Sequence, residues 1–360
     1  MSQTRATTTE LRDEPRGLRE EDSFDVVAVH DWLAARLPEI AQAGPPRVKQ
    51  FAGGASNLTY LLSYPQTELI LRRPPLGTKA KSAHDMTREY RVQHNLRPVF
   101  PQVPRVLALC TDDSVIDADF YVMERLDGLI LRRDLPEGFT LDPAGARSLC
   151  EETVATLVAL HQVDPATADL ADLGKGQGYV ERQVSGWSRR YRAAKTENVP
   201  DFEPIMAWLA EHQPDDVATC VIHNDYRLDN LVLDPADLHV IGVLDWEMAT
   251  LGDPLMDLGG ALAYWVQADD DAGMQLARRQ PTHVPGMMTR DEFVQEYARL
   301  SGIQVDDWSF YEVFGLFRVA VIAQQIYYRY HHGQTTNPAF ATFADWVRYC
   351  EQRCRRIIGI

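Results

Sequence analysis

Long hydrophobic runs are absent from this 360-residue sequence, and no apolar stretch approaches the roughly 18 residues that a membrane-spanning helix needs. The N-terminal residues mix Thr, Arg, Glu and Asp, so they also lack the apolar core of a secretory signal. Segments of this composition bury too little apolar surface to fold, and we expect a flexible tail over residues 1–25. These absences favour a cytoplasmic protein without a membrane partner.

Cysteine is scarce as well, and the five cysteines form an odd, scattered set: Cys110, Cys150, Cys220, Cys350 and Cys354. A disulfide framework has an even number of cysteines at regular spacings, so this set indicates free thiols in a reducing compartment.

An excess of positive charge is missing too. The sequence has 36 Lys and Arg against 52 Asp and Glu, which gives a net charge of -16. Non-specific nucleic-acid binding depends on clustered Lys and Arg, so we predict no nucleic-acid partner. A nucleotide remains compatible with this charge, because a local group of cations or a bound magnesium ion holds phosphates on acidic proteins.

Three common catalytic motifs do not occur: G-x-x-x-x-G-K-[ST], G-x-S-x-G and H-E-x-x-H. Their absence removes the usual signs of P-loop, esterase and zinc-protease chemistry.

What the sequence does have is a change of periodicity near its first third. Five segments with strand character surround one helical segment: Val48–Phe51, Leu58–Leu62, Leu69–Leu71, Val103–Leu109 and Phe120–Met123 around Asp85–Leu96. A short helix over Val26–Leu37 precedes them, and from Asp142 onward the pattern is largely helical. We therefore predict an α+β protein with a small β-rich lobe over residues 26–124 and a larger helical lobe over 125–360.

Polar residues with the spacing of a kinase catalytic loop lie inside the helical half. The segment from His223 to Asn230 reads H-x-D-x-x-x-x-N, between two apolar runs with strand character. Asp245 comes 15 residues after Asn230, at the end of another apolar run. Phosphoryl transfer needs a carboxylate that accepts the proton of the attacking hydroxyl and hard oxygen ligands for magnesium. Asp225 fits the first role, and Asn230 and Asp245 fit the second.

Two residues close to Asp225 in the sequence have expected roles as well. We expect His223 to brace the loop by hydrogen bonds. Arg227 either neutralises charge on the transferring phosphoryl group or is a surface arginine paired with Asp229.

The first lobe contains candidates for nucleotide binding. Gly53, Gly54, Ser56 and Asn57 belong to a loop whose main-chain N–H groups would cover phosphates, although glycines between strands most often form a simple hairpin turn. Arg72 ends the third strand, where kinases carry a phosphate-binding lysine, and Glu89 is the available partner; the alternative is a surface arginine. The segment around Glu124 and Leu126 would be the hinge whose backbone edges bind adenine.

Taken together, these residues resemble the aminoglycoside phosphotransferase-like kinases, in particular the branch associated with acyl-CoA dehydrogenases. The resemblance is carried by separated segments: GGASNLTY at 53–60, LRRPP at 71–75, GYVERQVSGW at 178–187, HNDYRLDN at 223–230 and LDWEMATLGDPLMDL at 244–258. It implies a two-lobe protein-kinase-like fold with an antiparallel five-stranded sheet, ATP and magnesium, and phosphorylation of a small-molecule hydroxyl. For this branch it suggests a hydroxyacyl-CoA acceptor and an acyl-CoA dehydrogenase as functional neighbour.

The resemblance also implies roles for single residues. Asp225 becomes the base, Arg72 and Glu89 the phosphate-side ion pair, and Asp257 a support of the catalytic loop. Two positions depart from the family pattern: Asn224 replaces a glycine, a residue type that tolerates left-handed backbone angles, and Ala55 replaces a glutamine.

The acceptor is the most open question. Several residues fall in regions that would border the acceptor pocket: Arg182, Trp187, Tyr191 and Arg318. Arginines suit an anionic acyl or phosphate-bearing substrate, whereas acidic linings suit a polycationic aminoglycoside. Whole-chain charge points toward the aminoglycoside, which stays as the alternative. A catalytically silent nucleotide-binding module is the third hypothesis.

Overall fold

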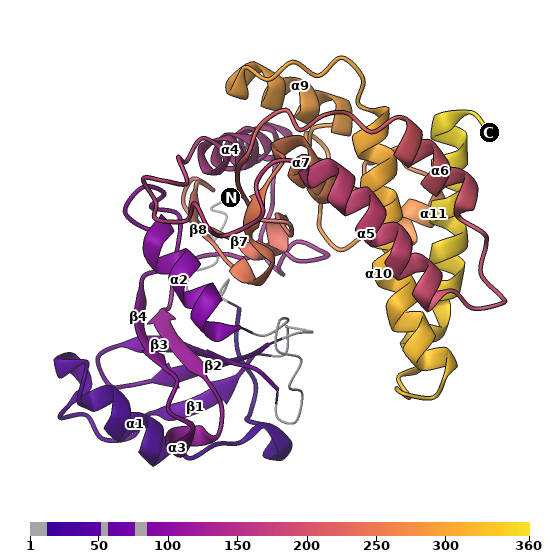
Figure 1. Cartoon of the computed structure of the whole chain (residues 1–360). Helices are drawn as coiled ribbons and strands as arrows, with labels where there is room; N and C mark the ends of the chain where they lie inside the picture. Colours follow the sequence, from indigo (N-terminus) through magenta and orange to yellow (C-terminus); the bar gives the residue numbers. More distant parts are fainter. Residues whose placement is uncertain (1–12, 52–56, 76–84) are drawn as a thin grey trace. The chain divides into compact units, whose positions relative to one another are not determined.

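An antiparallel sheet forms the frame of the first of two units (Figure 1). The computed structural model describes residues 13–51, 57–75 and 85–360. The five strands of this sheet, in spatial order, are β1 (Arg47–Gln50), β2 (Leu58–Ser63), β3 (Glu68–Arg73), β5 (Phe120–Glu124) and β4 (Val106–Cys110). The helices of this unit are α1 (Val26–Ala34), α2 (Met86–Leu96) and α3 (Asp113–Ile116), with 3-10 turns η2 (Glu20–Asp22), η3 (Pro38–Ile40) and η5 (Trp246–Met248).

Both faces of the sheet are covered, because alternate residues of each strand point to opposite sides. Leu61 and Ile70 pack on one face with Met86 of α2. Tyr60, Leu69 and Leu71 pack on the opposite face. They pack there with Leu33 of α1. The five strands and the helix between the third and fourth of them are confirmed. Since Ile70 packs with Met86, the even-numbered residues of β3 point to the side of α2.

Part of the expected N-terminal tail is attached to the edge of the sheet. The main-chain N–H of Arg16 donates to Gln50 O at 2.8 Å, and Gln50 N–H donates back at 3.0 Å. The Tyr60 hydroxyl donates to Asp22 O at 2.8 Å. The flexible tail over residues 1–25 stays a prediction, to which the structure adds that the edge strand β1 offers main-chain groups that pair with Arg16. Residues 1–12 lie outside the described part of the chain.

A second segment, Asn230–Met248, returns to the first unit. It forms the hairpin β7 (Leu231–Leu233) and β8 (Val240–Val243). Leu129 and Leu233 exchange main-chain hydrogen bonds of 2.8 Å, and Val243 N–H donates to Gln102 O at 2.7 Å. The sequence predicts a single boundary after residue 124. The structure adds Asn230–Met248 to the first unit, since these hydrogen bonds join residues more than a hundred positions apart.

The second unit comprises Leu131–Asp229 and Ala249–Ile360 and is mainly helical. Its helices are α4 (Pro143–His161), α5 (Tyr179–Ala194), α6 (Glu203–Glu211), α7 (Pro254–Leu262), α8 (Ala272–Ala277), α9 (Arg290–Ser301), α10 (Ser309–His331) and α11 (Phe343–Ile358). The remaining elements are the short strands β6 (Cys220–Ile222) and β9 (Thr250–Gly252) and the turn η6 (Pro338–Thr342). The turn η4 (Leu228–Asn230) begins in this unit, and its last residue belongs to the first. No helix in the described part of the chain has both the length and the apolar character needed to cross a membrane.

Helix α5 begins at Tyr179, and its start is held by a distant residue. The carboxylate of Asp216 accepts hydrogen bonds from the N–H groups of Tyr179 and Val180, each at 2.8 Å. Free N–H groups at a helix start require such an acceptor. Because Asp216 lies more than thirty residues downstream, the local pattern does not reveal the cap.

Helices α7 and α10 cross closely at two glycines. A Cβ atom added to Gly315 would lie 2.3 Å from Gly259 O, and one added to Gly259 would lie 2.7 Å from Tyr311 O. The contact atoms are main-chain oxygens, so neither helix yields by moving a side chain. Glycine at these positions lets α7, which carries Asp257, pack against α10, which carries Arg318.

We expect Gly315→Ala to lower the free energy of unfolding by about 1–3 kcal/mol, the usual cost of overpacking, although alanine is the better helix former. Gly186→Ala in α5 is the matched control, because its Cβ atom meets nothing closer than 3.9 Å. This control should be neutral or stabilising by up to about 1 kcal/mol. Urea unfolding measures both, and equal effects would contradict the close crossing.

Candidate active site

A buried carboxylate holds the segment that carries Asp225. Asp257 of α7 is 1% exposed and accepts hydrogen bonds from the N–H groups of His223 at 2.8 Å and Asn224 at 2.7 Å. His161 Nε2 lies 3.1 Å from the same carboxylate, and Tyr297 Oη lies 2.8 Å from His161 Nδ1. Burial opposes the ionised form, but the hydrogen bond and charge of His161 and the contacts of His223 lower the pKa of Asp257 overall.

The backbone of the loop turns sharply at the position that departs from the family pattern. Asn224 has φ of 65°, in the left-handed region that asparagine tolerates. Its side-chain oxygen accepts a hydrogen bond from the Tyr179 hydroxyl at 3.1 Å, and its main-chain oxygen accepts one from Arg318 Nη2 at 2.5 Å. His223 is fully buried, and its Nδ1 accepts from Asp225 N–H at 3.2 Å. These contacts agree with the bracing interpretation of His223.

Asp225 faces a small charged group within the second unit. Arg227 Nη2 lies 3.3 Å from its carboxylate, and Arg227 Nε lies 3.2 Å from Asp229. Burial raises the pKa of Asp229, and the negative charge of Asp225 adds to this effect. Arg227 also lies 4.8 Å from the centre of the Tyr264 ring, within cation–π range. Arg227 therefore pairs with Asp229, as one interpretation expects, and also contacts Asp225; its role toward a phosphoryl group stays a prediction.

The first unit contains a second charged group, centred on Arg72. The alternation of β3 directs Arg72 to the side of α2, where its Nη2 lies 3.2 Å from Glu89 Oε1. The same Nη2 donates to Asp245 Oδ1 at 2.8 Å. The predicted pairing of Arg72 with Glu89 is confirmed, and the structure adds Asp245 as a second carboxylate on the same guanidinium. The residue is 9% exposed, which excludes a surface arginine.

Glu89 is held from three sides. The Tyr121 hydroxyl donates to its Oε1 at 2.8 Å, and Asn57 Nδ2 lies 3.4 Å from its Oε2. Burial raises the pKa of Glu89, while the charge of Arg72 acts in the opposite direction. Asn57 Nδ2 also donates to Glu247 Oε2 at 3.0 Å, so Asn57 joins α2 to the turn that follows Asp245.

The β7–β8 hairpin brings the two expected magnesium ligands to neighbouring positions. Leu231 pairs with Val243, and Leu244 N–H donates to Asn230 O at 2.8 Å, so Asn230 lies across the ladder from the residue before Asp245. Asp245 has φ of 68°, and its side chain is 29% exposed. An amide oxygen and a partly exposed carboxylate are hard donors of the kind that magnesium prefers. The donor chemistry of this hairpin therefore fits a magnesium ion.

Of the other residues expected to bind the nucleotide, the structure describes Glu124 and Leu126. Gly53, Gly54 and Ser56, like Ala55, lie outside the described residues. Glu124 ends β5, and its carboxylate accepts from Arg105 N–H at 2.8 Å and Arg97 Nη1 at 3.1 Å. Leu126 follows in a half-buried position beside Gly242, where an added Cβ atom would lie 2.0 Å from Leu126 Cδ1.

The expected substrate residues divide into two groups. Tyr191 is fully buried between Phe202 and Phe317, and its hydroxyl donates to Pro200 O at 2.6 Å. It is a core residue, and its interpretation as a substrate contact is wrong because its ring has no free face.

Arg182, by contrast, is half-buried and donates to the carbonyls of Gly176 and Gln177, so it closes the turn before α5. Trp187 and Arg318 lie close together, with the guanidinium carbon 5.6 Å from the indole centre.

Tyr264 and Tyr179 are two residues near Asp225 and Asn224 that are not among the candidates named from the sequence. Burial raises the pKa of Tyr264, and the charge of Asp225 raises it further, while Arg227 and Arg318 lower it. Burial likewise raises the pKa of Tyr179 to about 12, against the effect of Arg318. Tyr179 belongs to the GYVERQVSGW segment, which is the one sequence signal that points to it.

This chain is similar in sequence and in structure to known proteins. A family model described as the phosphotransferase enzyme family matches residues 47–313. Acyl-CoA dehydrogenase family member 10 of Mus musculus is 37% identical over 296 residues, which is 82% of this chain and 27% of that protein. The crystal structure of a "putative aminoglycoside phosphotransferase" from Ralstonia eutropha is 31% identical with a TM-score of 0.79, covering 94% of this chain and 99% of that one.

A more distant structure supports the fold alone. Choline kinase from Cryptosporidium parvum superposes with a TM-score of 0.62 at 11% identity, covering 92% of this chain and 94% of that one. The fold is therefore kinase-like, as expected. The chain belongs to the phosphotransferase enzyme family, and it is a phosphotransferase of the small-molecule kinase class. It spans less than half the length of the curated relatives it matches.

We expect Asp257→Asn to lower the free energy of unfolding by about 2–3 kcal/mol at neutral pH, because hydrogen bonds to a charged acceptor are lost or weakened. The pKa of Asp257 is lowered by folding, so its contribution is present above the unfolded pKa of about 3.9 and is lost as the pH falls through the folded value. The difference between wild type and variant should shrink below about pH 4.

Asp215→Asn is the control for this change, because Asp215 is exposed and forms no ion pair or hydrogen bond within the described ranges. Urea unfolding across the acid range gives both curves. A wild-type-to-variant difference that stayed constant with pH would contradict the assigned role of the Asp257 charge.

We expect Arg72→Gln to destabilise the protein by about 3 kcal/mol, because it leaves Glu89 buried without its cation. Adding Glu89→Gln removes that unpaired charge, so the double variant should be more stable than Arg72→Gln alone. A double-mutant cycle by chemical unfolding measures the coupling. Strict additivity of the two single effects would show that the pair makes no energetic contribution.

Proposed function

We propose that this chain transfers the γ-phosphoryl group of ATP to a hydroxyl of a small molecule, with Asp225 as the base. Asp225 accepts the hydroxyl proton, the freed oxygen forms a bond to the γ-phosphorus, and the bond from that phosphorus to the bridging oxygen breaks to release ADP. The observation that carries the proposal is the loop held by Asp257, which fixes the backbone on which Asp225 stands.

Magnesium is part of this proposal. The side chains of Asn230 and Asp245 would hold the ion, which supplies positive charge against the phosphates. Arg72 already contacts Asp245 and would pair with phosphate oxygens from the same position. Arg227, next to Asp225, would offset negative charge on the transferring group.

Nucleotide binding is assigned to the first unit. The loop with Gly53, Gly54, Ser56 and Asn57 would supply main-chain N–H groups to phosphates, and Asn57 ties the end of that loop to Glu89. The main chain around Glu124 and Leu126 would bind adenine. Within the described ranges Leu126 makes no main-chain hydrogen bond, which suits such a role.

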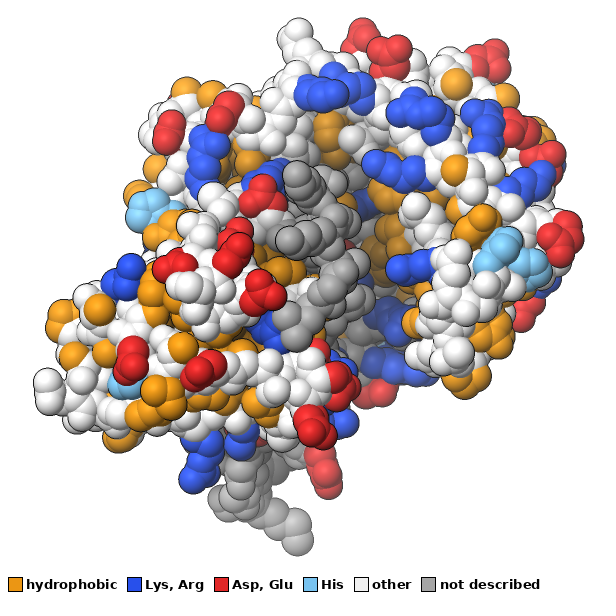
Figure 2. Space-filling model, turned by 60° about the horizontal axis from the view of Figure 1, so that its bottom comes forward, with side chains coloured by type: hydrophobic (Ala, Val, Ile, Leu, Met, Phe, Trp, Pro, Cys, Tyr) orange, Lys and Arg blue, Asp and Glu red, His pale blue; other side chains and the backbone are white. Residues whose placement is uncertain are grey.

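A hydroxyacyl-CoA-type compound is the acceptor we favour. The matched curated relatives carry the name acyl-CoA dehydrogenase, and Arg318 lies against the loop that carries Asp225. Lys and Arg side chains are numerous at the right of Figure 2, over the second unit, despite the net charge of -16. An acyl-CoA dehydrogenase is accordingly the functional neighbour we propose.

An aminoglycoside is the second candidate, favoured by the name of the Ralstonia eutropha relative. A catalytically silent nucleotide-binding module is a weaker alternative, because Asp225, Asn230 and Asp245 are all present.

The experiment is a coupled assay of ADP release with a panel of hydroxy acids, their CoA thioesters and aminoglycosides. We expect turnover with the thioesters, and Asp225→Ala should reduce it by about 10²–10⁴-fold while ATP binding persists. Asp215→Asn, a neutralised surface carboxylate, should retain full turnover. Turnover with aminoglycosides alone would overturn the acceptor assignment, and an active Asp225→Ala variant would overturn the base.

A further inference from the structure

A buried arginine without a carboxylate partner lies beside the loop that carries Asp225. Arg318 of α10 is 8% exposed, and no Asp or Glu of the described ranges forms an ion pair with it. Among the described residues, its hydrogen bond runs from Nη2 to Asn224 O at 2.5 Å. Arginine has five N–H donors, so most of its donor capacity is left over.

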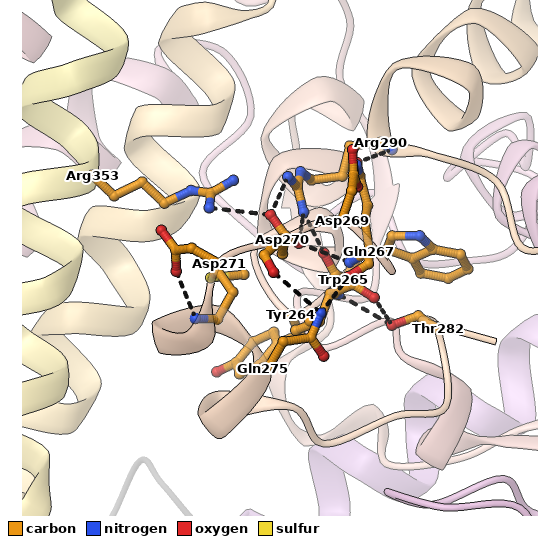
Figure 3. A network of polar contacts seen from close by, with 12 residues as sticks. Tyr264, Trp265, Gln267, Asp269, Asp270, Asp271, Gln275, Thr282, Arg290 and Arg353 are labelled. Carbon is orange, nitrogen blue, oxygen red and sulfur yellow. Dashed lines mark hydrogen bonds and ion pairs between the residues drawn. The ribbon is translucent and has the colours of Figure 1, made fainter.

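Elsewhere in the same unit, two half-buried arginines are paired with a carboxylate. Arg290 binds both oxygens of Asp270, at 2.6 and 2.8 Å, and Arg353 contacts the same carboxylate at 3.2 Å (Figure 3). Arg290 also donates to Trp265 O at 2.8 Å. Buried charges are ordinarily compensated in this way. Arg318 has no such carboxylate within the described ranges, so its charge is available to a partner that comes from outside the chain.

A second arginine reaches the same aromatic ring. The guanidinium of Arg190 lies 4.5 Å from the centre of Trp187, and that of Arg318 lies 5.6 Å from it. Neither Arg190 nor its neighbour Arg189 forms an ion pair within the described part of the chain. Burial lowers the pKa of Arg190, and the charges of Arg189 and Arg318 lower it further. Like charges gathered without an acid favour an anion between them.

The backbone of α7 leaves space for the Arg318 guanidinium. A Cβ atom added to Gly260 would lie 2.6 Å from Arg318 Nη1, so any other residue there would displace it. Burial raises the pKa of Tyr264, the charge of Asp225 raises it further, and the charge of Arg318 lowers it. The charge of Arg318 therefore acts on the hydroxyl of Tyr264, the same group on which the charge of Asp225 acts.

We propose that Arg318 and Arg190, with the face of Trp187, form an oxyanion-binding subsite that selects acceptors carrying a carboxylate or phosphate as well as a hydroxyl. The role in acceptor selection rests on the proposed function, whereas anion binding itself does not. An anion here would bind Arg318 by charge-assisted hydrogen bonds. Because Arg318 also holds Asn224, binding would fix the residue directly before Asp225. A polycationic acceptor would meet like charge at this place.

The test compares three probes with one carbon skeleton: 3-hydroxybutyrate, 3-hydroxybutyryl-CoA and the neutral 1,3-butanediol. Binding of each to the full chain is measured by calorimetry without ATP, and turnover is measured with ATP. We expect Arg318→Gln to weaken binding of at least one anionic probe by about 10-fold to 100-fold, the range for a hydrogen bond to a charged group. The KM for the diol should change by less than about threefold.

Two further variants make the result specific. Arg192→Gln is the control, since Arg192 is an exposed arginine of the same helix as Arg190 and pairs with Glu203 at 2.6 Å. It should leave all three probes unaffected. Gly260→Ala displaces Arg318 without removing its charge and should reproduce the selective loss, which keeps the test decisive if Arg318→Gln does not fold.

The outcomes separate the two proposals. A loss confined to 3-hydroxybutyrate assigns the subsite to a carboxylate, and one confined to the thioester assigns it to CoA phosphates. Equal effects on charged and neutral probes, or no binding of either anion to wild type, would overturn the subsite. Anion binding that depends on Arg318 without phosphorylation of any acceptor would uphold the subsite and overturn the proposed function.

Discussion

The arrangement of the second unit depends on the hydrogen bonds that the carboxylate of Asp257 accepts. This carboxylate is buried, ionised and bound to the N–H groups of two consecutive loop residues and to His161. Since α7 packs on α10 through Gly259 and Gly315, the position of that carboxylate is set by helix packing and not by the loop itself. The left-handed turn at Asn224 follows, and with it the direction of Asp225 and the carbonyl that Arg318 binds.

The first unit is organised by one guanidinium instead. Arg72 joins β3, α2 and the hairpin that ends at Asp245, because it contacts Glu89 and Asp245 with the same nitrogen. Two carboxylates share one cation there. Under the proposed function, the second unit would supply proton acceptance and oxyanion binding, and the first unit would supply phosphate and metal binding.

Much of this arrangement follows from local sequence patterns. Strand alternation places Arg72 on the side of α2, so its pairing with Glu89 is predictable, and the tolerance of asparagine for positive φ explains residue 224. Contacts between distant segments are not predictable in this way, as the Asp216 cap of α5 and the Arg72–Asp245 ion pair show. Tyr191 is a different case, because its place in the apolar stripe with Val184 and Ala194 already indicated a core residue.

The most direct test of the central claim is phosphorus NMR of the products formed from ATP, magnesium and 3-hydroxybutyryl-CoA. The account predicts a new phosphomonoester signal on the acceptor that appears together with ADP. Release of inorganic phosphate alone, with the acceptor hydroxyl unmodified, would contradict it.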